Sequence, residues 1–243
     1  MGGATLLLCC ERCSLLCRRL AANKALTLSV AAALMLSSGR AQATLIDFET
    51  ISGGTPSEGL VISDQFLATA GVSFALEGGG FPVLAEVGSP TTAFQPSDTP
   101  AAGQGTGSFF LTDTGSLGGA NPPAVIISYA ISTSVASGVL LDIDFKESWA
   151  IEAFDGSGIL LETISIAAGD PGAGNALATP WVFNRPTNDI ASIKLTGSRP
   201  TNVFGLGFDN FDTGVVPEPG TGLLLGSGLA LLAFRGRRPR RCS

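Results

Sequence analysis

Residues 149–166, WAIEAFDGSGILLETISI, contain two apolar stretches of strand length joined by a short turn. In the first stretch Trp149, Ile151 and Ala153 occupy alternate positions, which is the period of two of a half-buried strand. The residues between the stretches, DGSG at 155–158, are all turn formers. The pattern therefore predicts a β-hairpin in which Trp149 packs into the core.

Comparable stretches recur on both sides of this hairpin, and no window shows a helical period of 3.6 residues. A charged fraction of only 14% together with 32 Gly and 14 Pro favours short strands joined by neutral loops. The predicted strands span residues 44–48, 71–76, 108–112, 124–131, 138–145, 149–154, 159–166, 190–196 and 203–208, and the predicted loops span 52–58, 78–80, 89–107, 115–123 and 167–180. We therefore expect an all-β, two-sheet antiparallel β-sandwich over residues 44–214.

Charge is distributed unevenly along the chain. Residues 44–216 hold 18 acidic residues and only four basic ones, a net charge of −14. The four basic residues are Lys146, Arg185, Lys194 and Arg199. Such a body repels nucleic acid and anionic lipid, so we expect no nucleic-acid partner and regard cations as its natural counterpart.

The chemistry available to the body is limited. The chain has no His, and its five cysteines all lie in the end segments, at positions 9, 10, 13, 17 and 242. Cys10 and Cys13 form a CxxC pair, but no second pair or His completes a zinc site. The usual bases, thiol nucleophiles and disulfides are therefore missing from the body, and we do not expect an enzyme.

The N-terminal segment has the three parts of a secretory signal peptide. Arg18, Arg19 and Lys24 precede the apolar run at 25–36, and Ala41 and Ala43 form an A-x-A cleavage site. The apolar run is shorter than the roughly 20 residues that span a bilayer. We expect signal peptidase to remove residues 1–43, of which 1–17 is a candidate mis-assigned start; the alternative is a retained N-terminal anchor.

The C-terminal segment, residues 215–243, also has three parts. VPEPGT at 216–221 is followed by an apolar run at 222–234 and by RGRRPRR at 235–241. This order resembles the PEP-CTERM sorting signal. The resemblance implies that an exosortase-type membrane peptidase acts near Val216, Pro217, Glu218 and Pro219 and releases or transfers the body.

The arginines after the apolar run stay cytoplasmic by the positive-inside rule, so this run would form a short hydrophobic sorting helix. It would hold the protein transiently at the inner membrane, before the protein reaches the cell surface or the extracellular space. The alternative is a plain C-terminal anchor, for which the run is short.

Short motifs at both ends of the body support a second resemblance. TLIDFE at 44–49 opens the body and FGLGFDNFD at 204–212 closes it, with VISDQF at 61–66 and GVSF at 71–74 between them. The arrangement is similar to the jelly-roll domains common in PEP-CTERM proteins, and distantly to galactose-binding-like and carbohydrate-binding modules. The resemblance implies neighbouring first and last strands, often around a structural calcium ion.

Calcium prefers six to eight oxygen ligands. Asp47, Glu49, Asp209 and Asp212 would supply them if the terminal strands are neighbours, with Glu49 and Asp209 the best candidates. The alternative is that these four are solvated acids at the sheet edge.

Two further groups of side chains are candidates for chemistry. Asp142, Asp144, Glu147 and Glu152 form the densest acidic cluster, which we expect on a solvated outer face. The less favoured alternatives are a glycosidase pair of Asp142 and Asp144 and a surface that binds a cation or a sugar. Trp181, which follows a Gly- and Pro-rich loop, is either a sugar platform or a buried cap on the sandwich.

These features favour an exported cell-envelope or extracellular-matrix protein that binds polysaccharide. The alternatives are a structural surface protein without a ligand and, less favoured, a glycan hydrolase.

Overall fold

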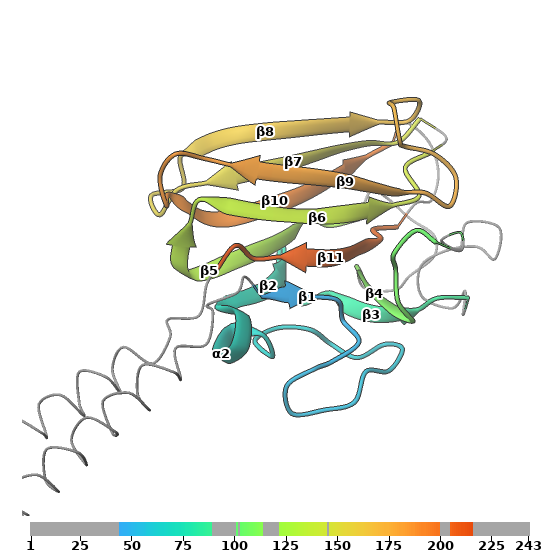
Figure 1. Cartoon of the computed structure of the whole chain (residues 1–243), viewed down its shortest axis with the longest axis horizontal. Coiled ribbons are helices and arrows are strands. Elements are labelled where there is room, and N and C mark those ends of the chain that lie inside the picture. The colour runs from blue at the N-terminus through green and yellow to red at the C-terminus, as the bar shows by residue number, and fades with distance from the viewer. Residues whose placement is uncertain are drawn as a thin grey trace, which may run out of the picture. The chain divides into compact units, whose positions relative to one another are not determined.

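The computed structural model describes residues 44–88, 101, 103–113, 122–144, 146–199 and 205–215. All of them fall within one compact unit, residues 42–217. Its strands form two antiparallel sheets packed face to face, as Figure 1 shows. The all-β antiparallel sandwich expected from the sequence is therefore confirmed.

The six-stranded sheet has the order β3-β4-β11-β6-β9, with β1 also paired to β11. Its strands are β1 (Leu45–Ile46), β3 (Val83–Glu86), β4 (Phe109–Thr112), β6 (Val135–Leu141), β9 (Ala178–Asn184) and β11 (Phe208–Asp212). The five-stranded sheet has the order β2-β5-β10-β7-β8. Its strands are β2 (Val72–Leu76), β5 (Val125–Thr133), β7 (Ser148–Phe154), β8 (Leu160–Ala167) and β10 (Ile190–Ser198). A single helical turn, α2 (Leu67–Ala70), precedes β2.

The predicted hairpin is present as β7 and β8. Trp149, Ile151 and Ala153 are all buried, and the alternate residues of β7 are more exposed. Asp155 stabilises the turn, because its carboxylate accepts the N–H groups of Ser157 and Ile159 at 2.8 Å each. The local sequence was therefore sufficient to predict this unit.

Two strands were not predicted, one was predicted in the wrong register, and one was displaced along the chain. The strand predicted over 203–208 is displaced, because residues 205–207 lie outside any strand and β11 begins at Phe208. β3 was missed, and β9 lies in a stretch predicted partly as loop because it contains Pro180. Proline is tolerated there because β9 is an edge strand. In the predicted strand over 138–145, Leu141, Ile143 and Phe145 alternate with Leu140, Asp142 and Asp144, and the first three were expected to face the core. In the structure β6 ends at Leu141, and Leu140 rather than Leu141 joins the main core. The predicted strand over 138–145 is therefore wrong beyond residue 141.

The main core is dominated by aromatic rings from both sheets. Trp181 of β9 stacks on Phe208 of β11 with ring centroids 6.3 Å apart, and it also contacts Phe183 and Phe211. Gly138 of β6 lies beneath two of these rings. A Cβ at that position would lie 2.8 Å from Phe208 and 3.1 Å from Trp181, so a larger residue would displace them.

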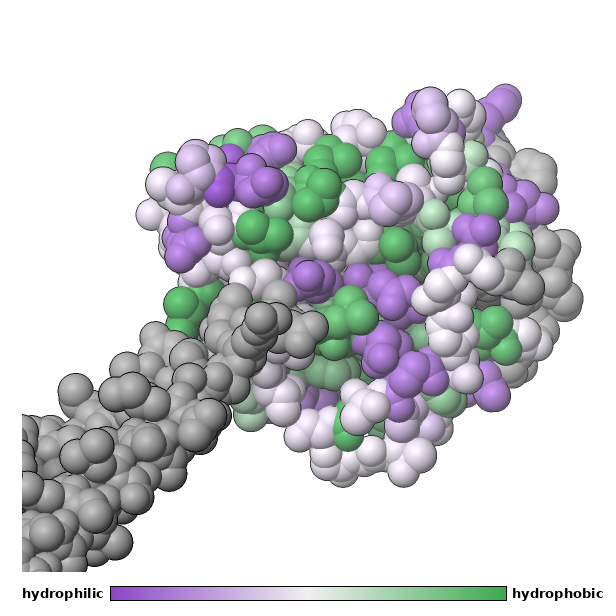
Figure 2. Space-filling model, in the orientation of Figure 1, coloured by the Kyte–Doolittle hydropathy of each residue, from purple (hydrophilic) through white to green (hydrophobic). Residues whose placement is uncertain are grey.

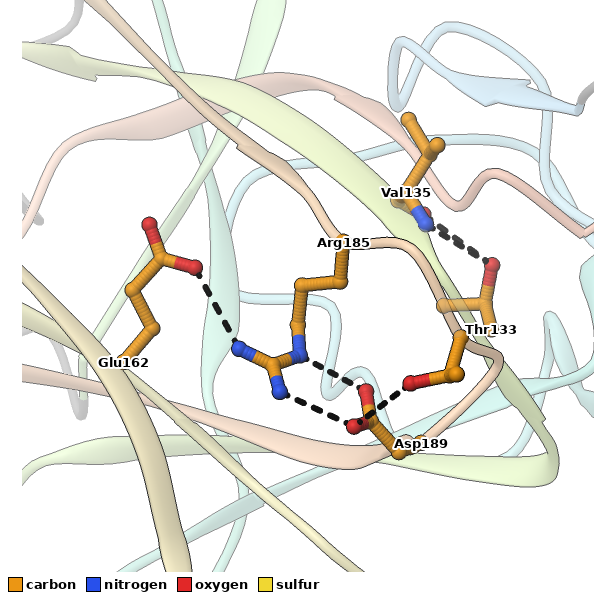
Figure 3. A network of polar contacts seen from close by, with 6 residues as sticks. Thr133, Val135, Glu162, Arg185 and Asp189 are labelled. Atoms are coloured by element: carbon orange, nitrogen blue, oxygen red, sulfur yellow. Dashed lines mark hydrogen bonds and ion pairs between the residues drawn. The ribbon is translucent and has the colours of Figure 1, made fainter.

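An ion-pair network joins the edge strands of the two sheets (Figure 3). Arg185, directly after β9, donates to both carboxylate oxygens of Asp189 at 2.7 and 2.9 Å, and Glu162 of β8 lies 3.6 Å away. The hydrogen bonds from Arg185 hold the pKa of Asp189 at about 2. The network therefore connects β8 and β9 where no backbone pairing does.

Among the described residues, no helix has the length and apolar character needed to cross a membrane. Apart from Val215, both predicted targeting segments lie outside the described residues. The segments outside include Ala41 and Ala43 at the signal cleavage site and Val216, Pro217, Glu218 and Pro219 at the sorting site.

Candidate functional site

The pairing of β1 with β11 brings three of the four predicted calcium ligands into one region. Ile46 lies opposite Phe211, so Asp47 and Glu49, just after β1, approach the first half of β11. Phe48 between them has a φ of 57°, a left-handed conformation that a residue with a bulky side chain rarely adopts. Asp209 of β11 is fully buried in this region.

Glu49 fastens a distant loop to this region. Its Oε1 accepts the N–H groups of Ser108 at 2.5 Å and Phe109 at 2.8 Å. A Cβ on Gly107 would overlap the Glu49 carboxylate, so only glycine permits this approach of the backbone. Residues 107–109 are thereby held against the start of the body.

Asp209 combines complete burial with incomplete hydrogen bonding. Its Oδ1 accepts the Asn210 N–H at 2.7 Å, whereas its Oδ2 is buried and has no hydrogen-bond partner within the described part of the chain. Burial raises the pKa of Asp209 to about 7 and the charges of Glu49 and Asp47 add to this shift, whereas the backbone N–H groups of Asn210 and Gly107 oppose it. A buried carboxylate oxygen without a partner is costly, and a cation would satisfy it.

The fourth predicted ligand, Asp212, has a different environment. It lies three residues further along β11, and its Oδ1 accepts the Gly214 N–H at 2.9 Å. In the described ranges, no three acidic, His or Cys side chains converge at metal-binding distances. Of the four predicted ligands, the acids that lie near one another are therefore Glu49 and Asp209, with Asp47 near them.

Trp181 does not form a sugar platform. Its side chain is turned into the aromatic core and the residue is 4% exposed. The alternation of β9 explains this orientation, because Thr179, Trp181 and Phe183 face inward while Pro180 and Val182 face outward. The prediction of a sugar platform at Trp181 is therefore wrong, and the alternative of a buried ring holds.

The acidic cluster after β6 is less solvated than predicted. Asp142, with a φ of 57°, is buried, and its Oδ1 accepts the Ala176 N–H at 3.0 Å. Glu147 is 6% exposed and lies 3.4 Å from Arg199. Burial raises the pKa of Glu147 to about 8, and the charge of Asp144 adds to the shift while Arg199 opposes it. The solvated outer face predicted for this cluster is wrong for Asp142 and Glu147, because the chain leaves the strand at residue 142.

A shallow apolar groove lies on the outer face of the six-stranded sheet. Its volume is about 390 Å³, and its outward-facing lining residues are Ser137 and Val139 of β6, Pro180 and Val182 of β9, and Asn210 of β11. Figures 1 and 2 view the molecule from the side of β9, β6 and β11, and hydrophobic and polar residues are interspersed over that face.

The loop before β4 borders this groove, and the sequence interpretation missed its role. Asn210 donates through Nδ2 to the Gly105 carbonyl at 2.9 Å, and Ala178 donates its N–H to Gln104 at 3.0 Å. The repeated glycines of GQGTG at 103–107 are a usable sequence signal for close backbone approach. Nothing local indicates that the partner of this loop is Glu49, about 60 residues earlier.

The body ends where the predicted sorting segment begins. Thr213 donates its N–H to the Thr44 carbonyl at 3.2 Å, and Val215 donates to Thr213 Oγ1 at 3.2 Å. The Cγ1 atom of Val215 lies 3.5 Å from the position of a Cβ on Gly71. Both ends of the body, Thr44 and Val215, are therefore fastened at one end of the sandwich.

The family model described as "PEP-CTERM protein-sorting motif" matches residues 215–238. The chain carries a PEP-CTERM sorting motif. The motif implies an exported protein that an exosortase-type protease processes. A search of curated proteins gives no match to the chain.

Several solved structures are similar to the chain at low sequence identity. The K2 cleaved adhesin domain of Lys-gingipain matches 70% of this chain and 98% of its own length, with 10% identity and a TM-score of 0.42. TmCBM61, solved with beta-1,4-galactotriose, matches 58% of this chain and 86% of its own length, with 11% identity and a TM-score of 0.34. The CBM22-1–GH10 modules of Clostridium thermocellum xylanase 10B match 64% of this chain and 28% of their own length, with 12% identity and a TM-score of 0.30.

Proposed function

We propose that this protein is an exported, non-enzymatic β-sandwich that a sorting protease delivers to the cell surface or extracellular matrix. The observation that carries the proposal is the PEP-CTERM motif, which begins at residue 215, the last described residue of the sandwich. The absence of His from the chain and of Cys from residues 44–241 supports a role without catalysis.

The experiment is mass spectrometry of the mature protein from its native host. We expect an N-terminus at Thr44 and a C-terminus near Pro217-Glu218-Pro219. A mature protein that keeps the apolar run at 222–234 would instead support a plain C-terminal anchor.

The finer proposal is that the body binds polysaccharide at the groove of β6, β9 and β11. The apolar edges of Val139, Pro180 and Val182 suit the C–H faces of sugar rings, and Ser137 and Asn210 offer hydrogen-bonding groups. Because the body is strongly acidic, a neutral polysaccharide is favoured over an anionic one.

Two matched variants test this binding. Val182→Asp places a charge in the groove, whereas Ile159→Asp places one on the β7–β8 turn; the two positions are 57% and 62% exposed. On an array of neutral and anionic glycans, the first variant should lose binding and the second should retain it. If neither the wild type nor the control binds any glycan, the structural role without a ligand is favoured.

We also propose a structural calcium ion at Glu49 and Asp209. It would neutralise the buried carboxylate of Asp209 and join the start of the body to β11 and to residues 107–109. Isothermal titration of the purified, chelator-treated protein tests this proposal, because binding should be lost in Asp209→Asn and kept in a variant of an exposed acid, Glu86→Gln.

A further inference from the structure

The end of the sandwich at which Val215 lies exposes large apolar side chains. Val215 packs beside Gly71, which is the C-cap of α2, and the Gly71 carbonyl accepts the Ala130 N–H at 2.9 Å. These contacts place α2 and the last part of β5 beside the last described residues. Figure 1 shows α2, β1, the end of β11 and β5 at the same end of the sandwich.

Three large apolar side chains are exposed around this point. Leu45 of β1 is 55% exposed, Leu67 of α2 is 45% exposed and Ile131 of β5 is 72% exposed. Leu45 lies opposite Asp212 in the pairing of β1 with β11. The Leu67 carbonyl accepts the N–H of Gly71, the C-cap of α2. Ile131 directly follows Ala130, whose N–H donates to the Gly71 carbonyl. We call Leu45, Leu67, Ile131 and Val215 the exit surface.

A concave site adjoins the exit surface. A pocket of about 380 Å³ lies between β1 and the start of α2, lined by Leu45 and Ile51 and, on the helix side, by Phe66 and Thr69. Exposed apolar residues beside a pocket are typical of a protein-binding surface, in which side chains of the partner fill the pocket.

The short spacing between Val215 and the apolar run indicates which partner comes close to the exit surface. The PEP-CTERM motif begins at residue 215 itself, and only six residues, VPEPGT at 216–221, separate Val215 from the apolar run. Six residues span at most about 20 Å when fully extended. A protease that binds residues 216–219 therefore works within contact distance of the exit surface. An anionic lipid surface is a poorer partner, because the body has a net charge of −14.

We propose that the exit surface is a docking site for the membrane-embedded sorting protease, which recognises the folded body as well as the tail. This inference rests on the proposed processing of the tail. Docking of Leu67 and Ile131 would hold residues 216–219 at the protease, so that only a folded body is processed efficiently.

The test is pulse-labelling of the full chain in its native host, followed by measurement of tail cleavage. Leu67→Gln and Ile131→Thr together should slow cleavage about tenfold, as expected for loss of two buried apolar contacts. Ile159→Thr, at a position 62% exposed on the β7–β8 turn, should leave the rate unchanged. Thermal melting of each variant establishes that the body is still folded.

A second arm changes the spacing. A Gly-Ser linker inserted between Val215 and Val216 should also slow cleavage, because it separates the exit surface from the bound tail. Cleavage that is equally fast in the folded double variant, or faster with the linker, would overturn the docking proposal. So would a double variant that only loses binding to phosphatidylethanolamine–phosphatidylglycerol vesicles. A wild-type tail that is never cleaved would instead refute the proposed function.

Discussion

Asp209 and Glu147 are both buried acids with raised pKa values, yet their surroundings differ. Glu147 is 6% exposed and has Arg199 at 3.4 Å, so a basic side chain partly compensates for its burial. Asp209 is fully buried, one of its oxygens has no partner within the described residues, and the charged groups that shift its pKa are the acids Glu49 and Asp47. The difference teaches that a basic side chain of the same chain partly offsets the burial of Glu147, whereas Asp209 has only acids as charged neighbours and depends on a proton or an added cation.

The largest expected effect is the response to calcium. If a cation completes the Asp209 region, calcium at 100 times its Kd should stabilise the wild type by about 2.7 kcal/mol, or raise its Tm by about 5–10 °C. Asp209→Asn should abolish this response, and Glu147→Gln should retain it. Differential scanning calorimetry with calcium or chelator measures both, and a wild-type Tm that is the same in the two buffers would refute the calcium proposal.

The next effect is the pH dependence contributed by Glu147. Its pKa is about 8 in the folded protein and about 4.5 in the unfolded chain, so between these values the folded state binds the extra proton. The free energy of unfolding should therefore fall as pH rises from about 4.5 to 8, by ~1.4 kcal/mol for each pH unit. Urea unfolding at several pH values measures this slope, and Glu147→Gln should be flatter than the wild type. Equal slopes in the two proteins would mean that the pKa of Glu147 is not raised in the folded protein.

A smaller effect should follow from removing the partner of Glu147. Arg199→Met should raise the pKa of Glu147 further, because Arg199 is the basic group that lowers it. The expected loss of stability is about 1–3 kcal/mol at pH 9, with little change at pH 5, where Glu147 is protonated. Unfolding curves at the two pH values measure the difference, and a loss that is the same at both would indicate packing rather than charge.

The smallest effect belongs to Asp189, a half-buried acid that serves as the contrast to the two buried ones. Asp189 has a lowered pKa of about 2, so its pairing with Arg185 stabilises the fold at neutral pH and is lost as pH falls from about 4 towards 2. Asp189→Asn should lower Tm slightly at low salt and less at high salt, because solvent screens the pair. If Asp189→Asn lowered Tm by as much as the loss of calcium stabilisation expected for Asp209→Asn, the contrast between Asp189 and the buried acids would be wrong.

The fold was predictable where a local pattern decides the structure. The alternation in β7, the turn at Asp155 and the edges of β2, β4 and β10 follow from short-range periodicity and turn chemistry. β9 was partly missed because Pro180 argues against a strand, and only the position of β9 at a sheet edge makes proline acceptable. The register of β6 was wrong because both Leu140 and Leu141 are apolar, and the packing of opposite faces selects between them.

The candidate site was predictable only in part. The resemblance of the chain ends suggested that Asp47, Glu49, Asp209 and Asp212 would meet, and the pairing of β1 with β11 brings the first three together but not Asp212. The anchoring of Glu49 to Ser108 and Phe109 depends on contacts about 60 residues apart, which no local pattern encodes. The inward orientation of Trp181 depends on Gly138, which leaves room for the ring beneath a neighbouring strand.

By itself the sequence determined the C-terminal sorting motif, the all-β architecture and the acidity of the body, because each depends on composition or on the order of neighbouring residues. The tertiary structure alone decided which acids are buried, which of them lacks a partner, and which apolar residues remain exposed where the tail leaves. Burial and pairing are properties of segments that meet from distant parts of the chain, so they arise only when the two sheets close around a shared core.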